Sequence, residues 1–145
     1  MMDYSKILSK RASAIKPSGI RKFFDILDEM EGVISLTVGQ PDFLTPWHIR
    51  EAAIDSLEKG KSFYTSNSGL LKFREAISEY LQRRFEVKYN PKDEMIITVG
   101  GSEAIDLAIR AVVEPGDEVL IVEPSYVCYA PITQLTGGIA VPFPT

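Results

Sequence analysis

Apolar residues in the first 90 positions recur at the three-to-four spacing of amphipathic helices, and this spacing predicts four helices. A glycine or a proline follows each of them and would end it. The expected ranges are 4–15, 20–30, 46–59 and 69–87. We expect Thr45 to cap the third helix, with Pro46 at its first position. A short apolar strand is expected at 33–38, and loops are expected at 39–46 and 61–68.

The helix expected at 69–87 shows the clearest separation of apolar and charged faces. Its apolar positions are Leu70, Phe73, Ile77, Leu81 and Phe85. Its charged positions are Lys72, Glu75, Glu79 and Arg83. This separation is typical of a helix that packs on one side only.

After the turn at Asn90 and Pro91, the pattern changes to an alternation of strands and helices. The expected strands are 95–99, 118–122 and 139–143, and the expected helices are 102–113 and 126–135. An order of strand, helix, strand, helix and strand implies a parallel sheet with right-handed crossovers. The pattern therefore predicts an α/β fold.

Composition excludes several classes of protein. The chain has 145 residues, of which 45% are hydrophobic and 25% charged, and these values argue against disorder, collagen and a disulfide scaffold. The net charge of 16 − 20 = −4 argues against nucleic-acid binding through bulk charge. A single cysteine, Cys128, forms no internal disulfide, and a single histidine, His48, anchors no histidine-rich metal site. Without a membrane-spanning apolar run or a secretory signal, we expect a soluble cytoplasmic protein.

Charge is distributed unevenly along the chain. Every lysine and arginine lies at or before Arg110, and residues 111–145 contain only four acidic residues and no basic ones. Val141 and Phe143 have the character of strand residues with nothing after them to pair. We therefore expect the chain to be part of a longer protein. The alternative is a proline-rich edge strand that ends a small domain.

The segment TVGGSEAIDLAIRA, residues 98–111, ends a strand in two glycines and opens a helix. The N–H groups at a helix start and the helix dipole favour an anion, and Gly100 and Gly101 have no side chains that would block a phosphate. The Ser102 hydroxyl could cap the helix or donate to a phosphate oxygen. The segment matches neither the Walker A loop nor the G-x-G-x-x-G fingerprint of nucleotide-binding folds. The alternative is a tight turn with a serine cap and no ligand.

Five segments, in this order and spacing, resemble a known family. They are 18–26, 36–52, 63–77, 97–111 and 115–131. Together they are similar to the N-terminal part of the class I/II pyridoxal-phosphate-dependent aminotransferases of fold type I, and within that family to the aspartate/aromatic aminotransferase-like branch. The resemblance implies that 41–145 begin the large domain, an incomplete α/β/α unit with a mainly parallel sheet. Residues 1–40 would form an N-terminal helical segment of the small domain.

The resemblance also assigns cofactor-binding residues. In such enzymes the turn at Gly101, Ser102 and Glu103 holds the phosphate of pyridoxal 5′-phosphate through backbone N–H groups, and we expect the Glu103 carboxylate to point away from it. Tyr126 matches the aromatic residue that stacks on the cofactor ring and supports its use as an electron sink. The alternative for Tyr126 is a core aromatic residue at a helix start.

Two further residues carry implications for substrate and assembly. Tyr64 matches the tyrosine that reaches the cofactor phosphate of the partner subunit, so the resemblance implies a homodimer. Gly39, in Gly39-Gln40-Pro41-Asp42, matches the glycine that faces the carboxylate of the amino-acid substrate. An exposed loop aromatic residue and a turn glycine are the respective alternatives.

Aminotransfer between an amino acid and a 2-oxo acid needs a lysine that forms a Schiff base with the cofactor. In the family this lysine lies beyond the matched segments. Ser13–Lys16 and Ser56–Lys59 have its S-x-x-K spacing, but both lie at the ends of expected amphipathic helices. We therefore assign no catalytic residue and no metal ligand, and we expect the chain alone to be inactive. The alternatives are a lyase or synthase of the same fold that uses pyridoxal phosphate, and a non-catalytic module that binds a partner through its open sheet.

Overall fold

The computed structural model describes residues 7–17, 19, 26, 30, 32–34, 39 and 41–145. The helix expected at 20–30 and most of the strand expected at 33–38 lie outside the described residues. Contacts divide the chain into two compact units, residues 1–37 with 99–145, and residues 38–98. The predicted domain boundary near residue 40 stays a prediction.

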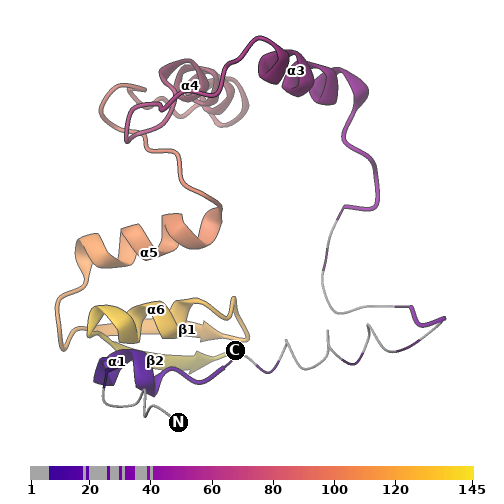
Figure 1. The fold of residues 1–145 in the computed structure, drawn as a ribbon. Helices are drawn as coiled ribbons and strands as arrows, with labels where there is room; N and C mark the ends of the chain where they lie inside the picture. The colour runs from indigo at the N-terminus through magenta and orange to yellow at the C-terminus, as the bar shows by residue number, and fades with distance from the viewer. Residues whose placement is uncertain are drawn as a thin grey trace. The chain divides into compact units, whose positions relative to one another are not determined.

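The first unit contains a two-stranded parallel sheet. Strand β1, Glu118–Glu123, pairs with β2, Ile139–Pro144, so that Leu120 lies opposite Val141. Helix α5, Gly101–Val112, precedes β1, and helix α6, Tyr129–Thr136, joins the two strands (Figure 1). The parallel pairing confirms the strand–helix–strand order that the sequence predicts here.

Side chains of the sheet alternate between a covered and an open face, as the pleat requires. Ile121 is buried, together with Ile132 and Thr133 of α6. By contrast, Leu120 is 68% exposed and Val122 52% exposed. In α5, Val112 is largely exposed, although its helical spacing predicts an inward side chain. The small core of this unit therefore lies between α6 and one face of the sheet.

Helix α6 is shorter at its start than expected, because Cys128 is its N-cap. Pro131 then falls in the first turn, where an N–H group has no intrahelical acceptor, so proline costs the helix no hydrogen bond. The helix ends at Gly137, whose φ of 97° is left-handed. The Gly138 N–H donates to the Thr133 carbonyl at 2.9 Å. These contacts turn the chain directly into β2.

Helix α1, Lys10–Ala14, lies in the same unit and within the expected range of 4–15. The side chain of Ser9 caps it by accepting a hydrogen bond from the Ala12 N–H at 3.1 Å. The Arg11 guanidinium donates to the carbonyl of Thr136 at 3.5 Å. This contact links α1 to the last turn of α6.

The second unit contains α3, Trp47–Glu58, and α4, Leu71–Phe85. The prediction that Thr45 caps the helix at 46–59 is wrong, because Pro46 is the N-cap and no side chain caps α3. Pro46 has an extended ψ of 142°, and its carbonyl accepts the first hydrogen bonds, from the N–H groups of Ile49 and Arg50. The helix therefore starts one residue later than expected.

Helix α4 buries two polar residues. Ser78 donates to the Tyr89 carbonyl at 2.5 Å, and Arg74 donates to the Pro91 carbonyl and, at 3.2 Å, to the Lys92 carbonyl. Meanwhile Phe73, on the expected apolar face, is 51% exposed. The covered side of α4 therefore includes two polar residues that are hydrogen-bonded to the segment 89–92.

The strand expected at 95–99 is a wrong prediction, since these residues form no strand. A strand requires a ladder partner, and in the described residues the Ile97 N–H donates instead to the Ser68 carbonyl at 3.0 Å. Ile97 also packs closely against Gly69, where an added Cβ would lie 2.6 Å from the Cβ and Cγ1 of Ile97. The segment therefore supports the loop before α4 instead of extending a sheet.

Candidate functional site

The candidate site is centred on the first turn of α5. Gly100 is the N-cap, with φ 86° and ψ 168°, a conformation that glycine adopts without steric cost. Gly101, Ser102 and Glu103 occupy the first three helical positions, where N–H groups lack intrahelical acceptors and the helix dipole is positive. A Cβ added at Gly100 or Gly101 would meet no described atom within 4 Å. The described chain therefore places no side chain directly against these two glycines.

The Glu103 side chain stabilises this turn through a hydrogen bond. Its carboxylate accepts a hydrogen bond from the N–H group of Val99, the residue before the N-cap. Glu103 is the third helical residue, so the contact is close to the reach-back half of a capping box. The carboxylate is thereby bound to backbone outside the helix. The sequence carries the signal, glutamate three positions after the cap, although our interpretation did not use it.

Ser102 is hydrogen-bonded to Tyr126, which is also predicted to contact the cofactor. The Ser102 Oγ and the Tyr126 hydroxyl oxygen are 2.8 Å apart, and either atom could donate. The predicted alternative in which Ser102 caps α5 is wrong, since Gly100 occupies the cap and no side-chain cap is formed. Because 24 positions separate the two residues, no local pattern could have revealed this contact.

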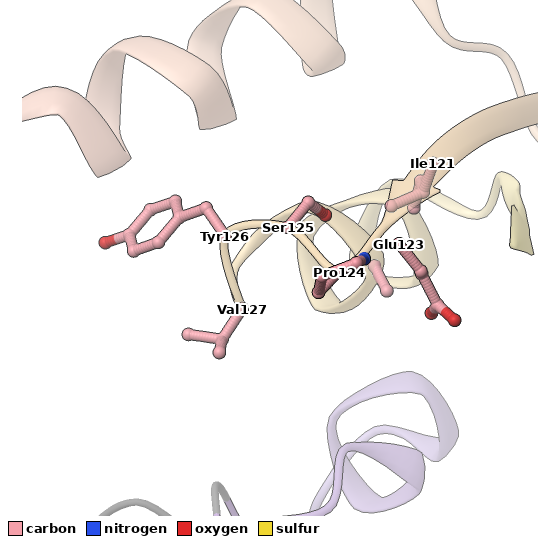
Figure 2. A pocket seen from close by; sticks show the side chains of 7 residues that line it. Ile121, Glu123, Pro124, Ser125, Tyr126 and Val127 are labelled. Carbon is pink, nitrogen blue, oxygen red and sulfur yellow. The ribbon is translucent and has the colours of Figure 1, made fainter. Parts of the chain in front are cut away.

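Tyr126 lies in the connection between β1 and α6, at the carboxyl end of β1. Its ring meets Tyr129 edge to face, with centroids 5.8 Å apart and an interplanar angle of 84°. Figure 2 shows the ring extending to one side of the connection, while the Glu123 carboxylate points to the other. Tyr126 is 50% exposed, so the described chain covers its side chain only in part.

A hollow of about 610 Å³ opens along this connection (Figure 2). Its lining residues come from the end of β1, the connection and the start of α6: Ile121, Glu123, Pro124, Ser125, Tyr126, Val127 and Ala130. In open α/β sheets, ligands bind outside the carboxyl ends of the strands. The volume is within the range of small-molecule sites.

Tyr64 and Gly39 belong to the second unit, whereas the α5 turn belongs to the first. Tyr64 is fully exposed. Its loop is held by the Ser66 hydroxyl, which donates to the Gly69 carbonyl at 2.7 Å. Gly39 is exposed and lies outside helix and strand. The roles predicted for both residues stay predictions.

Two other kinds of site find no support in the described part of the chain. No group of three or more histidine, cysteine, aspartate or glutamate residues there could hold a metal ion. Partial burial raises the pKa of the Cys128 thiol, which disfavours the reactive thiolate.

No helix among the described residues is both long and apolar enough to cross a bilayer.

Comparison with known proteins decides the family. Residues 31–145 match the family model described as "Aminotransferase class I and II". The chain belongs to the class I and II aminotransferase family. This membership confirms the resemblance inferred from the sequence, and the family uses pyridoxal 5′-phosphate.

Similar aminotransferases occur in bacteria and archaea. The Bacillus subtilis (strain 168) protein YugH is 58% identical over 134 residues, which are 92% of this chain and 35% of that protein. The aspartate aminotransferase of Pyrococcus abyssi (strain GE5 / Orsay) is 43% identical over 138 residues, 95% of this chain and 36% of that enzyme. The chain thus spans about a third of the length of the curated relatives it matches.

Solved structures confirm the α/β fold class of the fold type I aminotransferases. The structure called Pyrococcus protein-A1 has a TM-score of 0.88 at 44% identity. The match covers 93% of this chain and 35% of the chain in that structure. The aspartate aminotransferase from Thermus thermophilus with maleate has a TM-score of 0.86 at 36% identity and covers 95% and 37%, respectively.

The described residues of this aminotransferase-family chain fit the cofactor. The start of α5 presents backbone N–H groups and the Ser102 hydroxyl, which suit a phosphate, in front of open space. Tyr126 adds an aromatic ring joined to the same turn. Among the described residues of this turn, the Glu103 carboxylate carries a negative charge that would repel a phosphate. This carboxylate is hydrogen-bonded to the N–H group of Val99.

We expect Glu103→Gln to raise the affinity of the chain for pyridoxal phosphate about threefold. The glutamine amide oxygen can accept the same hydrogen bond from Val99, so the turn persists while one negative charge is removed. At an exposed position such a charge is worth about 0.5–1 kcal/mol. Fluorescence titration at fixed ionic strength measures the change. Glu103→Ala, which also loses the hydrogen bond, is the control and should not gain affinity. Equal or weaker binding by Glu103→Gln would contradict the charge argument.

Proposed function

We propose that this chain supplies the phosphate-binding turn and the ring-stacking face of a pyridoxal-phosphate-dependent aminotransferase that moves an amino group between an amino acid and a 2-oxo acid. The observation that carries the proposal is the 2.8 Å hydrogen bond that joins Ser102, in the turn, to Tyr126. It brings together a residue of helix α5 and a residue of the β1–α6 connection, both of which were assigned to one cofactor. Family membership and the named relatives support the reaction class.

Each of these residues has a definable task. When bound, pyridoxal phosphate withdraws electrons from the substrate amino acid and so permits its deprotonation. The N–H groups of Gly101, Ser102 and Glu103 would bind and orient the phosphate. The Tyr126 ring would cover one face of the pyridine ring and keep water from it.

The assembly that we propose is a homodimer in which Tyr64 reaches the cofactor phosphate of the partner subunit. The full exposure of Tyr64 supports this role, because the described residues of its own unit leave the phenol accessible. The Ser66–Gly69 hydrogen bond limits the motion of the loop that carries it. A phenol donates a hydrogen bond to a phosphate without adding a charge.

Two further assignments belong to the proposal. We place Gly39 on the substrate side of the site, where it faces the carboxylate of the amino acid. We assign residues 1–40 to a small domain and residues 41–145 to the large domain.

The test is a comparison of two ligands. We expect the chain to bind pyridoxal phosphate at least tenfold more tightly than pyridoxal, which has the same ring and no phosphate. The reason is that charge-assisted hydrogen bonds to the α5 turn act only on the phosphate. Quenching of intrinsic fluorescence measures both affinities, and inorganic phosphate should compete with the first ligand. Equal affinities for the two ligands would refute the phosphate-binding role of the turn.

A further inference from the structure

The Tyr126 hydroxyl has a place in the site that ring stacking does not explain. Stacking uses the face of an aromatic ring and would be served equally by phenylalanine. The hydroxyl, however, lies 2.8 Å from the Ser102 Oγ, at the second position of α5. It is therefore bonded to a side chain in the turn to which phosphate binding is assigned.

We propose that the Tyr126 hydroxyl is a positioning group for the cofactor phosphate and acts through Ser102. It donates its proton to the Ser102 Oγ, and the Ser102 hydroxyl proton is thereby directed to a phosphate oxygen. This proposal rests on the proposed function of the α5 turn. It adds to that function a directed chain of two hydrogen bonds that ends on the anion.

The hydrogen-bonding capacity of the two hydroxyls fixes the direction of this chain. Each hydroxyl has one proton to donate and can accept through its oxygen. An ionised phosphate oxygen only accepts, so a bound phosphate requires the Ser102 hydroxyl to donate to it. The Ser102 oxygen is then left as an acceptor, and Tyr126 is the donor within reach. Successive hydrogen bonds of this kind polarise and strengthen one another.

The surroundings of Tyr126 keep the phenol in place for this role. Tyr129 meets its ring edge to face at 5.8 Å, so the ring is restrained at its side while Ser102 restrains its oxygen. The two anchors lie on different elements, the start of α6 and the start of α5. Phosphate binding at the turn therefore also fixes the ring that stacks on the cofactor.

A double-mutant cycle tests the proposal, with Ser102→Ala, Tyr126→Phe and the double variant. Pyridoxal phosphate and pyridoxal are the two probes. We expect Tyr126→Phe to weaken pyridoxal phosphate binding about fivefold, as for a hydrogen bond between neutral groups. Ser102→Ala should weaken it at least about tenfold, as for a hydrogen bond to a charged group. The double variant should be no weaker than Ser102→Ala, because the phenol acts through the serine. Pyridoxal affinity should be unchanged in Tyr126→Phe, which keeps the ring.

Tyr129→Phe is the matched control, because it removes a neighbouring phenol oxygen and keeps the ring contact. It should bind both probes like the wild-type chain. Far-UV circular dichroism checks that each variant is folded. We expect the variants at Ser102 and Tyr126 to fold, because both side chains are exposed. Additive losses in the cycle would overturn the relay. So would equal weakening of both probes by Tyr126→Phe, which would indicate a role in ring placement alone. A wild-type chain that does not distinguish the two probes would refute the proposed function itself.

Discussion

Replacing Gly69 by alanine is expected to lower the free energy of unfolding by about 2–4 kcal/mol. Two costs add at this position. Gly69 has a φ of 91°, in the left-handed region that side chains rarely adopt. An added Cβ would also lie 2.6 Å from both Cβ and Cγ1 of Ile97, and Cβ is fixed to the backbone, so rotation of the Ile97 side chain cannot relieve the overlap. Urea denaturation followed by circular dichroism measures the loss.

Gly60→Ala separates the two costs. Gly60 has a φ of 65°, and an added Cβ there would meet nothing within 4 Å. Only the backbone cost applies, so we expect a loss of about 1 kcal/mol. If the two alanine variants unfold at the same urea concentration, the contact between Gly69 and Ile97 contributes nothing to stability. Because the loop 64–69 carries Tyr64, Gly69→Ala should also disturb the position of that side chain.

No aminotransferase turnover is expected from the 145-residue chain. The reaction needs a lysine amine that holds the cofactor covalently and then moves a proton. Residues 111–145, which include Tyr126, contain no lysine. Lys59, one of the S-x-x-K candidates, ends α3 in the other unit and is paired with Asp55 at 2.7 Å. Lys16 lies beyond the end of α1.

Two measurements check this expectation. An assay of amino transfer to 2-oxoglutarate should give the same rate with and without the chain. Borohydride treatment in the presence of pyridoxal phosphate should leave no single lysine modified stoichiometrically, as read by mass spectrometry. Clear turnover, or complete modification at one position, would show that a lysine of this chain performs the family's covalent role.

The sequence predicts α5, β1 and β2 well because each is specified locally. The glycine pair at the start of α5 and the proline–glycine turn after it mark the boundaries, and Val119 and Ile121 have strand character. The segment 95–99 has the same apolar, β-branched character, yet it forms no strand. Whether a segment pairs depends on a partner elsewhere in the chain, and residue pattern alone does not contain that information.

The site shows the same division between local and tertiary information. The α5 turn was predictable from Gly100 and Gly101, because a glycine pair between a predicted strand and a predicted helix marks a helix start. Backbone N–H groups at a helix start can bind an anion whatever the side chains are. The bond from Glu103 to Val99 was within reach of the capping-box rule. The contact between Ser102 and Tyr126 was not, because the fold alone brings these residues together. Family resemblance named both residues but did not join them.

The same contact has a thermodynamic consequence. Because the unfolded chain does not hold Ser102 near Tyr126, a phosphate ester that needs both residues binds the folded unit and not the unfolded one. At a hundred times its dissociation constant, such a ligand adds about 2.7 kcal/mol to the free energy of unfolding. The core of this unit is small, with Ile121, Ile132 and Thr133 as its buried residues among those described. The cofactor would then serve as a folding ligand, and saturation of the site would set how much of this unit is folded.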